Sequence, residues 1–250
     1  MSPPSSPLRA VFLDVGDTLM RADPSWEHIY AIAFAEMGIE VDIEALRVAL
    51  RRAYHHGGWG MEGGFVPNEE TSFQRTVEID QMAIAELGLG PMPQAFFRRL
   101  SELFGMTASW HIFPDVHPTL DGLKARGLVV GVVSNWVWSL PELLHALGLV
   151  RHFDFVVASA RVGYEKPRLE IFRNALEQAG VNGSEAIHVG DHVDADVQGA
   201  VAAGIDPVLI DRVGRYPASE VPGGVPVITS LEQLLPIVDT RLARARAVAT

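Results

Sequence analysis

Carboxylates, a hydroxyl and a lysine follow short apolar runs at four separate places in this chain. Taken singly, such residues most often cap a helix or shape a turn. Four such places, each at the end of an apolar run or in the loop after one, instead indicate a single site. The residues concerned are Asp14 and Asp17, Ser134 and Asn135, Lys166, and Asp191 and Asp196.

The chemistry open to these residue types is specific. Carboxylates that meet at one point repel each other unless a cation lies between them. Oxygen ligands of this kind favour Mg²⁺, which keeps part of its water shell and bridges to phosphate oxygens. A carboxylate can attack phosphorus to form an aspartyl-phosphate, while a hydroxyl and a lysine offset charge on the phosphoryl oxygens. The set therefore suffices for metal-assisted phosphoryl transfer.

Short strands and helices that alternate along the chain would bring these residues together. This alternation predicts an α/β fold with a parallel sheet of five or six strands, covered by helices on both faces. Ligands of such sheets bind outside the carboxyl ends of the strands. The expected strands are 8–13, 128–133, 153–158, 186–189, 207–210 and 225–228, and the expected helices are 116–126, 140–147, 169–179, 193–203 and 230–238.

Between the first strand and the rest of this pattern, the sequence has the periodicity of helices. Helices are expected from Pro24 to about Gly38, from Asp42 to Tyr54, over 69–87 and over 94–104. We therefore predict a helical insertion at residues 20–110 in an α/β domain made of residues 1–19 and 111–250. The arginine-containing tail 240–250 is expected to form a frayed, solvated helix.

Composition excludes several classes of site and partner. The 250 residues carry a formal charge of −11 and no cysteine, which rules out disulfides, thiolate zinc sites and a cysteine nucleophile. The acidic balance argues against nonspecific nucleic-acid binding. No apolar run approaches the ~20 residues that span a bilayer, and residues 1–9 lack a signal-peptide pattern. We expect a cytoplasmic protein that binds neither nucleic acid nor membrane; its oligomeric state is not indicated.

The four places, in order, resemble the four motifs of the haloacid dehalogenase (HAD) superfamily, in the branch with a helical cap after strand one. The resemblance extends from Leu8 to about Val238. It implies a Rossmann-like parallel sheet with a C1-type cap and a small phosphorylated metabolite as substrate. The matching segments are Asp14-Val15-Gly16-Asp17-Thr18, Val130-Gly131-Val132-Val133-Ser134-Asn135, Lys166-Pro167 and Gly190-Asp191-His192-Val193-Asp194-Ala195-Asp196.

The resemblance implies a Mg²⁺ site at the first and fourth motifs. Asp14 would be both the nucleophile and a metal ligand. The backbone carbonyl of Gly16 and the side chain of Asp191 would complete the ligands from the protein. Asp196 would belong to the same metal site, where it supports Lys166 or the groups around the metal.

The second and third motifs would hold the substrate. By the same resemblance, Ser134 and Asn135 would bind the phosphate. Lys166 would orient both Asp14 and the phosphate, which makes it a catalytic as well as a substrate-binding residue.

One position departs from the pattern of the family's phosphatases. They carry a second aspartate two residues after the nucleophile, which protonates the leaving group, and here that position is Gly16. Such proton transfer is typically worth about 10²–10⁴-fold in rate. Asp17, the next residue, is the candidate that could take over this role.

Three hypotheses follow from this departure. The first is a Mg²⁺-dependent phosphatase with a substitute acid or with substrates that need none. The second is a degenerate member that binds a phosphorylated ligand or partner without efficient turnover. The third is a 2-haloacid dehalogenase, since those relatives also lack the second aspartate; the Gly190-Asp191 metal motif argues against it.

Overall fold

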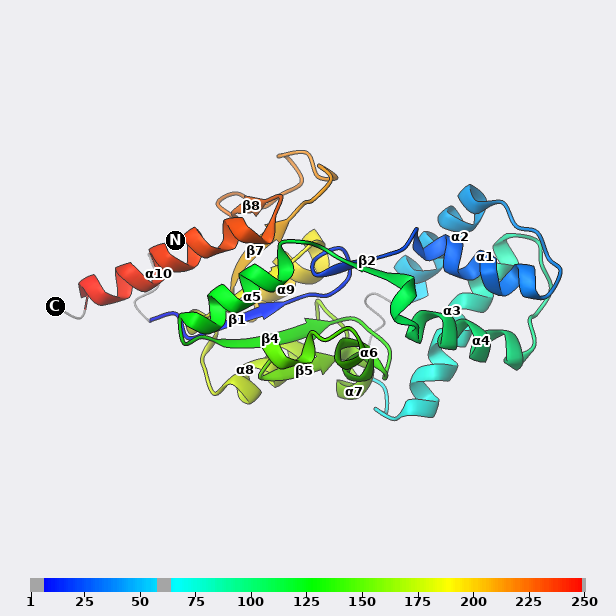
Figure 1. The fold of residues 1–250 in the computed structure, drawn as a ribbon, viewed down its shortest axis with the longest axis horizontal. Helices are drawn as coiled ribbons and strands as arrows, with labels where there is room; N and C mark the ends of the chain where they lie inside the picture. The colour runs from blue at the N-terminus through cyan, green and yellow to red at the C-terminus, as the bar shows by residue number, and fades with distance from the viewer. Residues whose placement is uncertain (1–6, 58–63, 249–250) are drawn as a thin grey trace.

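A six-stranded parallel sheet forms the centre of the α/β part of the molecule (Figure 1). The computed structural model describes residues 7–57 and 64–248. The strand order is β5-β4-β1-β6-β7-β8, so β1 lies between strands from two later parts of the chain. The strands are β1 (Ala10–Leu13), β4 (Val129–Ser134), β5 (Phe155–Ala158), β6 (Ala186–Gly190), β7 (Asp206–Ile210) and β8 (Val227–Ile228).

Alternate residues of β1 enter two separate apolar cores, as the two-residue period of a strand requires. Val11 and Leu13 belong to the core that includes α5 and α10. Ala10 and Phe12 belong to the core that includes α8 and α9. The helices of this part are α5 (Val116–Ala125), α6 (Leu140–Ala146), α7 (Ser159–Val162), α8 (Leu169–Ala179), α9 (Gly199–Ala202) and α10 (Leu234–Val248), with short turns of 3₁₀-helix at 107–109, 150–152, 183–185 and 231–233.

Four helices between β2 and β3 lie together at one end of the molecule (Figure 1). They are α1 (Trp26–Glu36), α2 (Ile43–Gly57), α3 (Glu69–Glu86) and α4 (Gln94–Gly105), close to the ranges expected from periodicity. Asp42 caps the start of α2, because its carboxylate accepts a hydrogen bond of 2.7 Å from the backbone of Ala45. A two-stranded antiparallel ribbon, β2 (Met20–Ala22) with β3 (Trp110–Ile112), connects this segment to the sheet.

Two helices form where they were expected but differ from the expectation in detail. The helix expected at 193–203 begins as a π-helical segment, Val193–Gln198, before α9. The tail expected to be solvated continues α10, and its Arg241 is only 8% exposed. Arg241 pairs with Asp206 at 2.8 Å and with the carbonyl of Ser184 at 2.8 Å, so it anchors the helix to the start of β7 and to the turn before β6.

A buried carboxyl group lies inside the four-helix segment. Asp80 on α3 accepts hydrogen bonds from the hydroxyls of Tyr30 (2.6 Å) and Tyr54 (2.9 Å). Burial raises the pKa of Asp80 to about 7, and the two tyrosine hydrogen bonds only partly oppose this rise. As the pH rises through neutrality, the Asp80 carboxyl therefore loses its proton and becomes a buried negative charge.

The raised pKa of Asp80 predicts that stability falls as pH rises. The unfolded carboxyl loses its proton near pH ~3.9, whereas the folded one keeps it to about pH 7. Between these values the folded state binds more protons, so the free energy of unfolding declines by about 1.4 kcal/mol per pH unit. Asp80→Asn should remove this decline and be the more stable protein at pH 8. Denaturant unfolding at pH 5 and pH 8 measures the free energy of unfolding of both proteins. An equal decline in the variant would contradict the assignment of the decline to Asp80.

Among the described residues, no helix combines the length and the apolar character needed to cross a membrane.

Candidate functional site

The carboxyl ends of β1 and β4 bring the nucleophile candidate and its partners together in the interior. Asp14 Oδ1 accepts a hydrogen bond of 2.8 Å from the Ser134 hydroxyl and one of 2.6 Å from Lys166 Nζ. All three side chains are buried. The parallel register explains the meeting, because Leu13, one residue before Asp14, pairs with Val132 on β4.

Asp14 Oδ2 has no hydrogen-bond partner among residues 7–57 and 64–248. One oxygen of the carboxylate is therefore held in place while the other remains open to a ligand or substrate. The loop that supplies Lys166 is held as well: the Asn135 side chain accepts from the backbone of Lys166 (2.7 Å) and donates to its carbonyl (3.0 Å). Asn135 thus fixes the backbone of the lysine.

Behind Lys166 lies a buried chain of ionisable groups. Lys166 Nζ also donates to Asp196 Oδ1 at 2.6 Å, and His188 Nε2 lies 2.8 Å from the same oxygen. Burial alone would raise the pKa of Asp196, but Lys166 and His188 hold it well below its usual range. Burial lowers the pKa of Lys166, yet Asp14 and Asp196 together raise it above its ordinary value. The lysine therefore stays charged.

Asp196 reaches this position because the residue beside it is glycine. A Cβ on Gly190 would lie 2.1 Å from Cγ of Asp196, a distance that no side chain could tolerate. The second oxygen of Asp196 accepts from the backbone of His192 at 3.0 Å. The π-helical segment that carries Asp196 is a form often found at functional sites. Both oxygens of Asp196 are thus engaged by the protein itself.

Three carboxylates form a cluster that has the chemistry of a cation site. Asp14, Asp191 and Asp196 each offer an oxygen, and these oxygens lie within 4.8 Å of one another. Burial raises the pKa of Asp191 well above its usual value, and the neighbouring Asp14 and Asp196 raise it further. Burial likewise raises the pKa of Asp14, although Lys166 opposes it. The positively charged side chains nearby therefore do not fully offset the negative charge of these three carboxylates.

Asp17 lies at this edge of the sheet but has a different partner. Its carboxylate is 3.5 Å from Arg215 Nη2, and Arg215 Nη1 donates to Asp191 at 2.9 Å. The Asp17 backbone is left-handed, with φ of 51°. The structure therefore places Asp17 beside Arg215 and does not show it bonded to Asp14.

Sequence reasoning did not identify two residues of the site. His188 lies fully buried inside β6, where it contacts Asp196. Arg215 lies in the loop after β7, held because its backbone and that of Tyr216 donate to Asp211 at 2.8 and 3.0 Å. The adjacency of β6 and β7 could have directed attention to that loop, since ligand sites gather at such strand ends.

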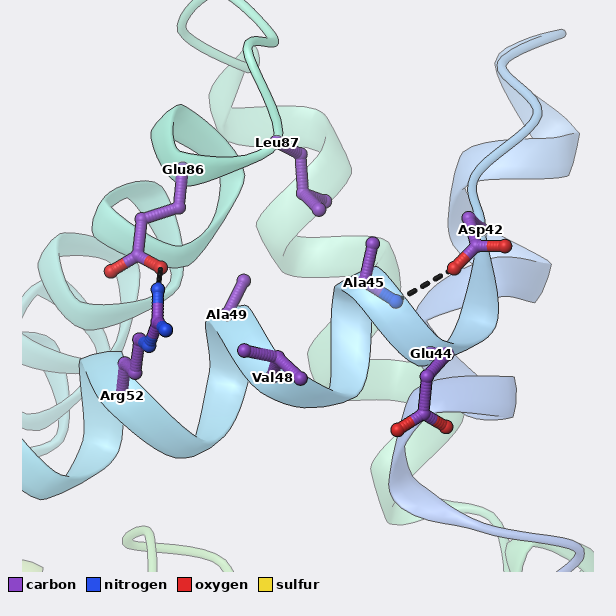
Figure 2. A pocket seen from close by; sticks show the side chains of 8 residues that line it. All are labelled: Asp42, Glu44, Ala45, Val48, Ala49, Arg52, Glu86 and Leu87. Carbon is purple, nitrogen blue, oxygen red and sulfur yellow. Dashed lines mark hydrogen bonds and ion pairs between the residues drawn. The ribbon is translucent and has the colours of Figure 1, made fainter.

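A separate hollow lies on the four-helix segment, away from the carboxylate cluster. It is formed by the start and middle of α2 and the end of α3 (Figure 2). Arg52 and Glu86 form an ion pair of 3.7 Å across it. None of its lining residues comes from the sheet, so it is separate from the carboxylate cluster.

Comparison with known proteins identifies the family. The model of the haloacid dehalogenase-like hydrolases matches residues 8–204. Haloacid dehalogenase-like hydrolase domain-containing protein 3 of Bos taurus is 31% identical over 242 residues, which cover 93% of this chain and 94% of that protein. Glyceraldehyde 3-phosphate phosphatase of Methanopyrus kandleri is 41% identical over 108 residues, which cover 42% of this chain and 45% of that protein.

The fold is shared with enzymes of more than one reaction. The solved structure of 2-haloacid dehalogenase from Pseudomonas syringae pv. Tomato matches with a TM-score of 0.61 and 26% identity, over 94% of this chain and 99% of that one. The family model spans most of the chain, and the relative from Bos taurus matches nearly its full length. The chain therefore belongs to the haloacid dehalogenase-like hydrolases and is a hydrolase with phosphatases among its relatives.

Proposed function

We propose that this enzyme hydrolyses a small phosphomonoester in a Mg²⁺-dependent reaction, through an aspartyl-phosphate on Asp14. The observation that carries the proposal is the state of the Asp14 carboxylate. Oδ1 is held by Ser134 and Lys166, while Oδ2 has no partner in the described part of the chain. A nucleophile needs this combination of fixed orientation and one open oxygen.

The donor set supports a divalent cation. Asp191 Oδ1 has no hydrogen-bond partner among the described residues, whereas Asp196 is occupied by Lys166, His188 and the backbone of His192. Asp14, Asp191 and the carbonyl of Gly16 would hold Mg²⁺, with Asp196 supporting Lys166. When bound, the ion would supply charge stabilisation for the phosphoryl oxygens and offset the crowded carboxylates.

The remaining residues would bind and orient the phosphate. Asp14 attacks phosphorus, the bond to the leaving oxygen breaks with its electron pair, and water then releases inorganic phosphate and restores the carboxylate. Ser134 and Lys166 would donate to phosphoryl oxygens during both steps. Asn135 acts on the substrate through the backbone of Lys166, which it holds at 2.7 and 3.0 Å.

Residues 20–110 would act as a cap over this site. Two contacts between the four-helix segment and the sheet domain support this role. Arg75 on α3 lies 3.3 Å from Glu165, the residue before Lys166. Trp26 on α1 packs against Trp136, two residues after Ser134, with ring centroids 5.6 Å apart.

Phosphate release from p-nitrophenyl phosphate tests the proposal. We expect release with Mg²⁺ and its loss when the metal is removed by a chelator, followed by recovery on adding Mg²⁺ again. A nitrophenolate leaves readily without an acid, so the missing aspartate at position 16 should not prevent this reaction. Activity that persists in chelator would contradict the role of the metal.

Two other outcomes would favour the alternative hypotheses. Absence of turnover together with Mg²⁺-dependent binding of a phosphate mimic would favour a protein that binds without catalysis. Chloride release from 2-chloropropionate without Mg²⁺ would favour a dehalogenase. Either result would overturn the proposed phosphatase reaction.

A further inference from the structure

The space beside Gly16 faces an aromatic ring. A Cβ placed on Gly16 would lie 3.6 Å from Cζ3 of Trp136, an ordinary contact, and would meet no other described atom within 4 Å beyond its chain neighbours. By the resemblance to the family's phosphatases, this is the side of the nucleophile loop where the leaving group is protonated. In this chain the neighbour on that side is the Trp136 ring.

Trp136 is part of an aromatic wall made of Trp26, Trp110 and Trp136. The centroids of Trp110 and Trp136 are 5.1 Å apart, and those of Trp26 and Trp110 are also 5.1 Å apart. The wall joins α1, β3 and the loop after β4, so both the four-helix segment and the sheet domain contribute to it. Trp26 is 39% exposed and Trp136 is half-buried, which leaves apolar ring surface beside a strongly polar site.

The backbone of Trp136 is held in place. Its N–H donates to the Ser159 hydroxyl at 3.2 Å, and its carbonyl accepts from the backbone of Ala160 at 3.2 Å. Ser159, the first residue of α7, is itself buried. Trp136 is therefore a fixed surface against which a substrate could pack.

Neither Gly16 nor Asp17 is placed to protonate a basic leaving group. Gly16 has no side chain, and the carboxylate of Asp17 lies beside the Arg215 guanidinium. A phenol has a pKa near ~10, whereas an aliphatic alcohol is about as weak an acid as water, at ~15.7. An aryloxide can therefore leave without protonation far more readily than an alkoxide.

We propose that the substrate is the phosphate monoester of a phenol, with its aromatic ring packed on the exposed surface of Trp136. This inference rests on the proposed function and names its substrate class. In the first step the Asp14 oxygen bonds to phosphorus, and the aryl oxygen leaves with the electron pair and takes its proton from water. Hydrolysis of the aspartyl-phosphate then completes the exchange of one ester and one water for a phenol and phosphate.

Binding of two phosphonates separates ring recognition from catalysis. Phenylphosphonate and propylphosphonate carry the same anionic group and are not hydrolysed, so calorimetry in Mg²⁺ compares an aromatic with an aliphatic substituent. We expect phenylphosphonate to bind about 3- to 10-fold more tightly, the range of an aromatic contact. Trp136→Leu should abolish this preference, and Trp136→Phe should keep most of it.

Trp138→Leu is the matched control. Trp138 lies in the same loop, but its ring packs under Arg161 and is not part of the aromatic wall. This variant should retain the preference for phenylphosphonate, and thermal unfolding should show that all three variants fold. Equal binding of the two phosphonates, a preference that survives Trp136→Leu, or no binding of either would overturn the inference. Failure of the proposed function would appear separately, as absent Mg²⁺-dependent turnover of every ester.

Discussion

Replacing Asp14 with asparagine is expected to abolish Mg²⁺-dependent phosphate release while leaving the fold intact. Asparagine keeps an oxygen that can accept from Ser134 and Lys166, which are 2.8 and 2.6 Å from Asp14 Oδ1. It loses the anionic oxygen that attacks phosphorus. The rate should fall on the order of 10⁴–10⁶-fold, as in other hydrolases that lose a member of the catalytic unit.

The same substitution should not destabilise the protein. Asp14 lies in a cluster with Asp191 and Asp196, and burial together with that crowding raises its pKa. Removing one negative charge therefore relieves repulsion, and thermal unfolding in the absence of metal should show an equal or higher melting temperature. A variant that fails to fold would leave the rate uninformative, so unfolding and activity must be measured on the same preparation.

Asp194→Asn provides the control for Asp14→Asn. Asp194 belongs to the same acidic segment as Asp191 and Asp196 but is exposed and accepts a hydrogen bond from Gln198 at 2.7 Å. Its substitution makes the same change in formal charge without touching the site. Activity that survives Asp14→Asn, or that is lost equally in Asp194→Asn, would refute the aspartyl-phosphate mechanism.

Gly16→Asp is expected to extend the activity to alkyl phosphates. The backbone of Gly16 is outside the left-handed region, and a Cβ there makes only an ordinary 3.6 Å contact with Trp136. An aspartate at this position is therefore sterically allowed and would supply the proton that an alkoxide needs. The rate for alkyl phosphates should rise about 10²-fold, the lower end of what a general acid contributes.

The rate for p-nitrophenyl phosphate should change much less, because its leaving group does not need protonation. Gly16→Asn is the control, since it has the same size but no transferable proton. A higher rate for alkyl phosphates in both variants would mean that the added side chain acts through packing and not through proton transfer. No gain in Gly16→Asp, with aryl turnover retained, would mean that the leaving group does not pass beside position 16.

The backbone of Asp17, the residue after Gly16, is strained. Asp17 has φ of 51°, a conformation that favours glycine. Adding Asp17→Gly to Gly16→Asp relieves that strain and also removes the contact of Asp17 with Arg215.

The single variant Asp17→Gly tests whether Asp17 supplies the proton in the native enzyme. If it did, Asp17→Gly would lower the rate for alkyl phosphates. We expect little change, because the Asp17 carboxylate is directed to Arg215.

Local patterns in the sequence determined most of the α/β framework. Strands and helices alternate with clear periodicity, and the carboxyl ends of parallel strands meet at one edge. This rule was enough to predict that Asp14, Ser134 and Lys166 would lie together, and the structure brings them into hydrogen-bond contact. The family pattern also identified Gly16 as the position where a proton donor is missing.

Tertiary structure alone decided the partners of these residues. The ribbon of β2 with β3 joins segments about ninety residues apart, and neither three-residue strand has enough periodicity to be recognised. His188 has the pattern of a core residue and becomes part of the site only because Asp196 folds back onto it at 2.8 Å. The placement of Arg215 on Asp191 depends on the adjacency of β6 and β7.

The physical reason for this division is the range of the forces involved. Periodicity and turn chemistry act over a few residues and can be read from a single segment. Pairing of buried charges depends on which distant side chains share a low-dielectric space, where each must find a partner. The sequence by itself therefore determined the strands and the reactive residues at their ends, whereas packing decided that Trp136 faces Gly16 and that Arg215 pairs with Asp17.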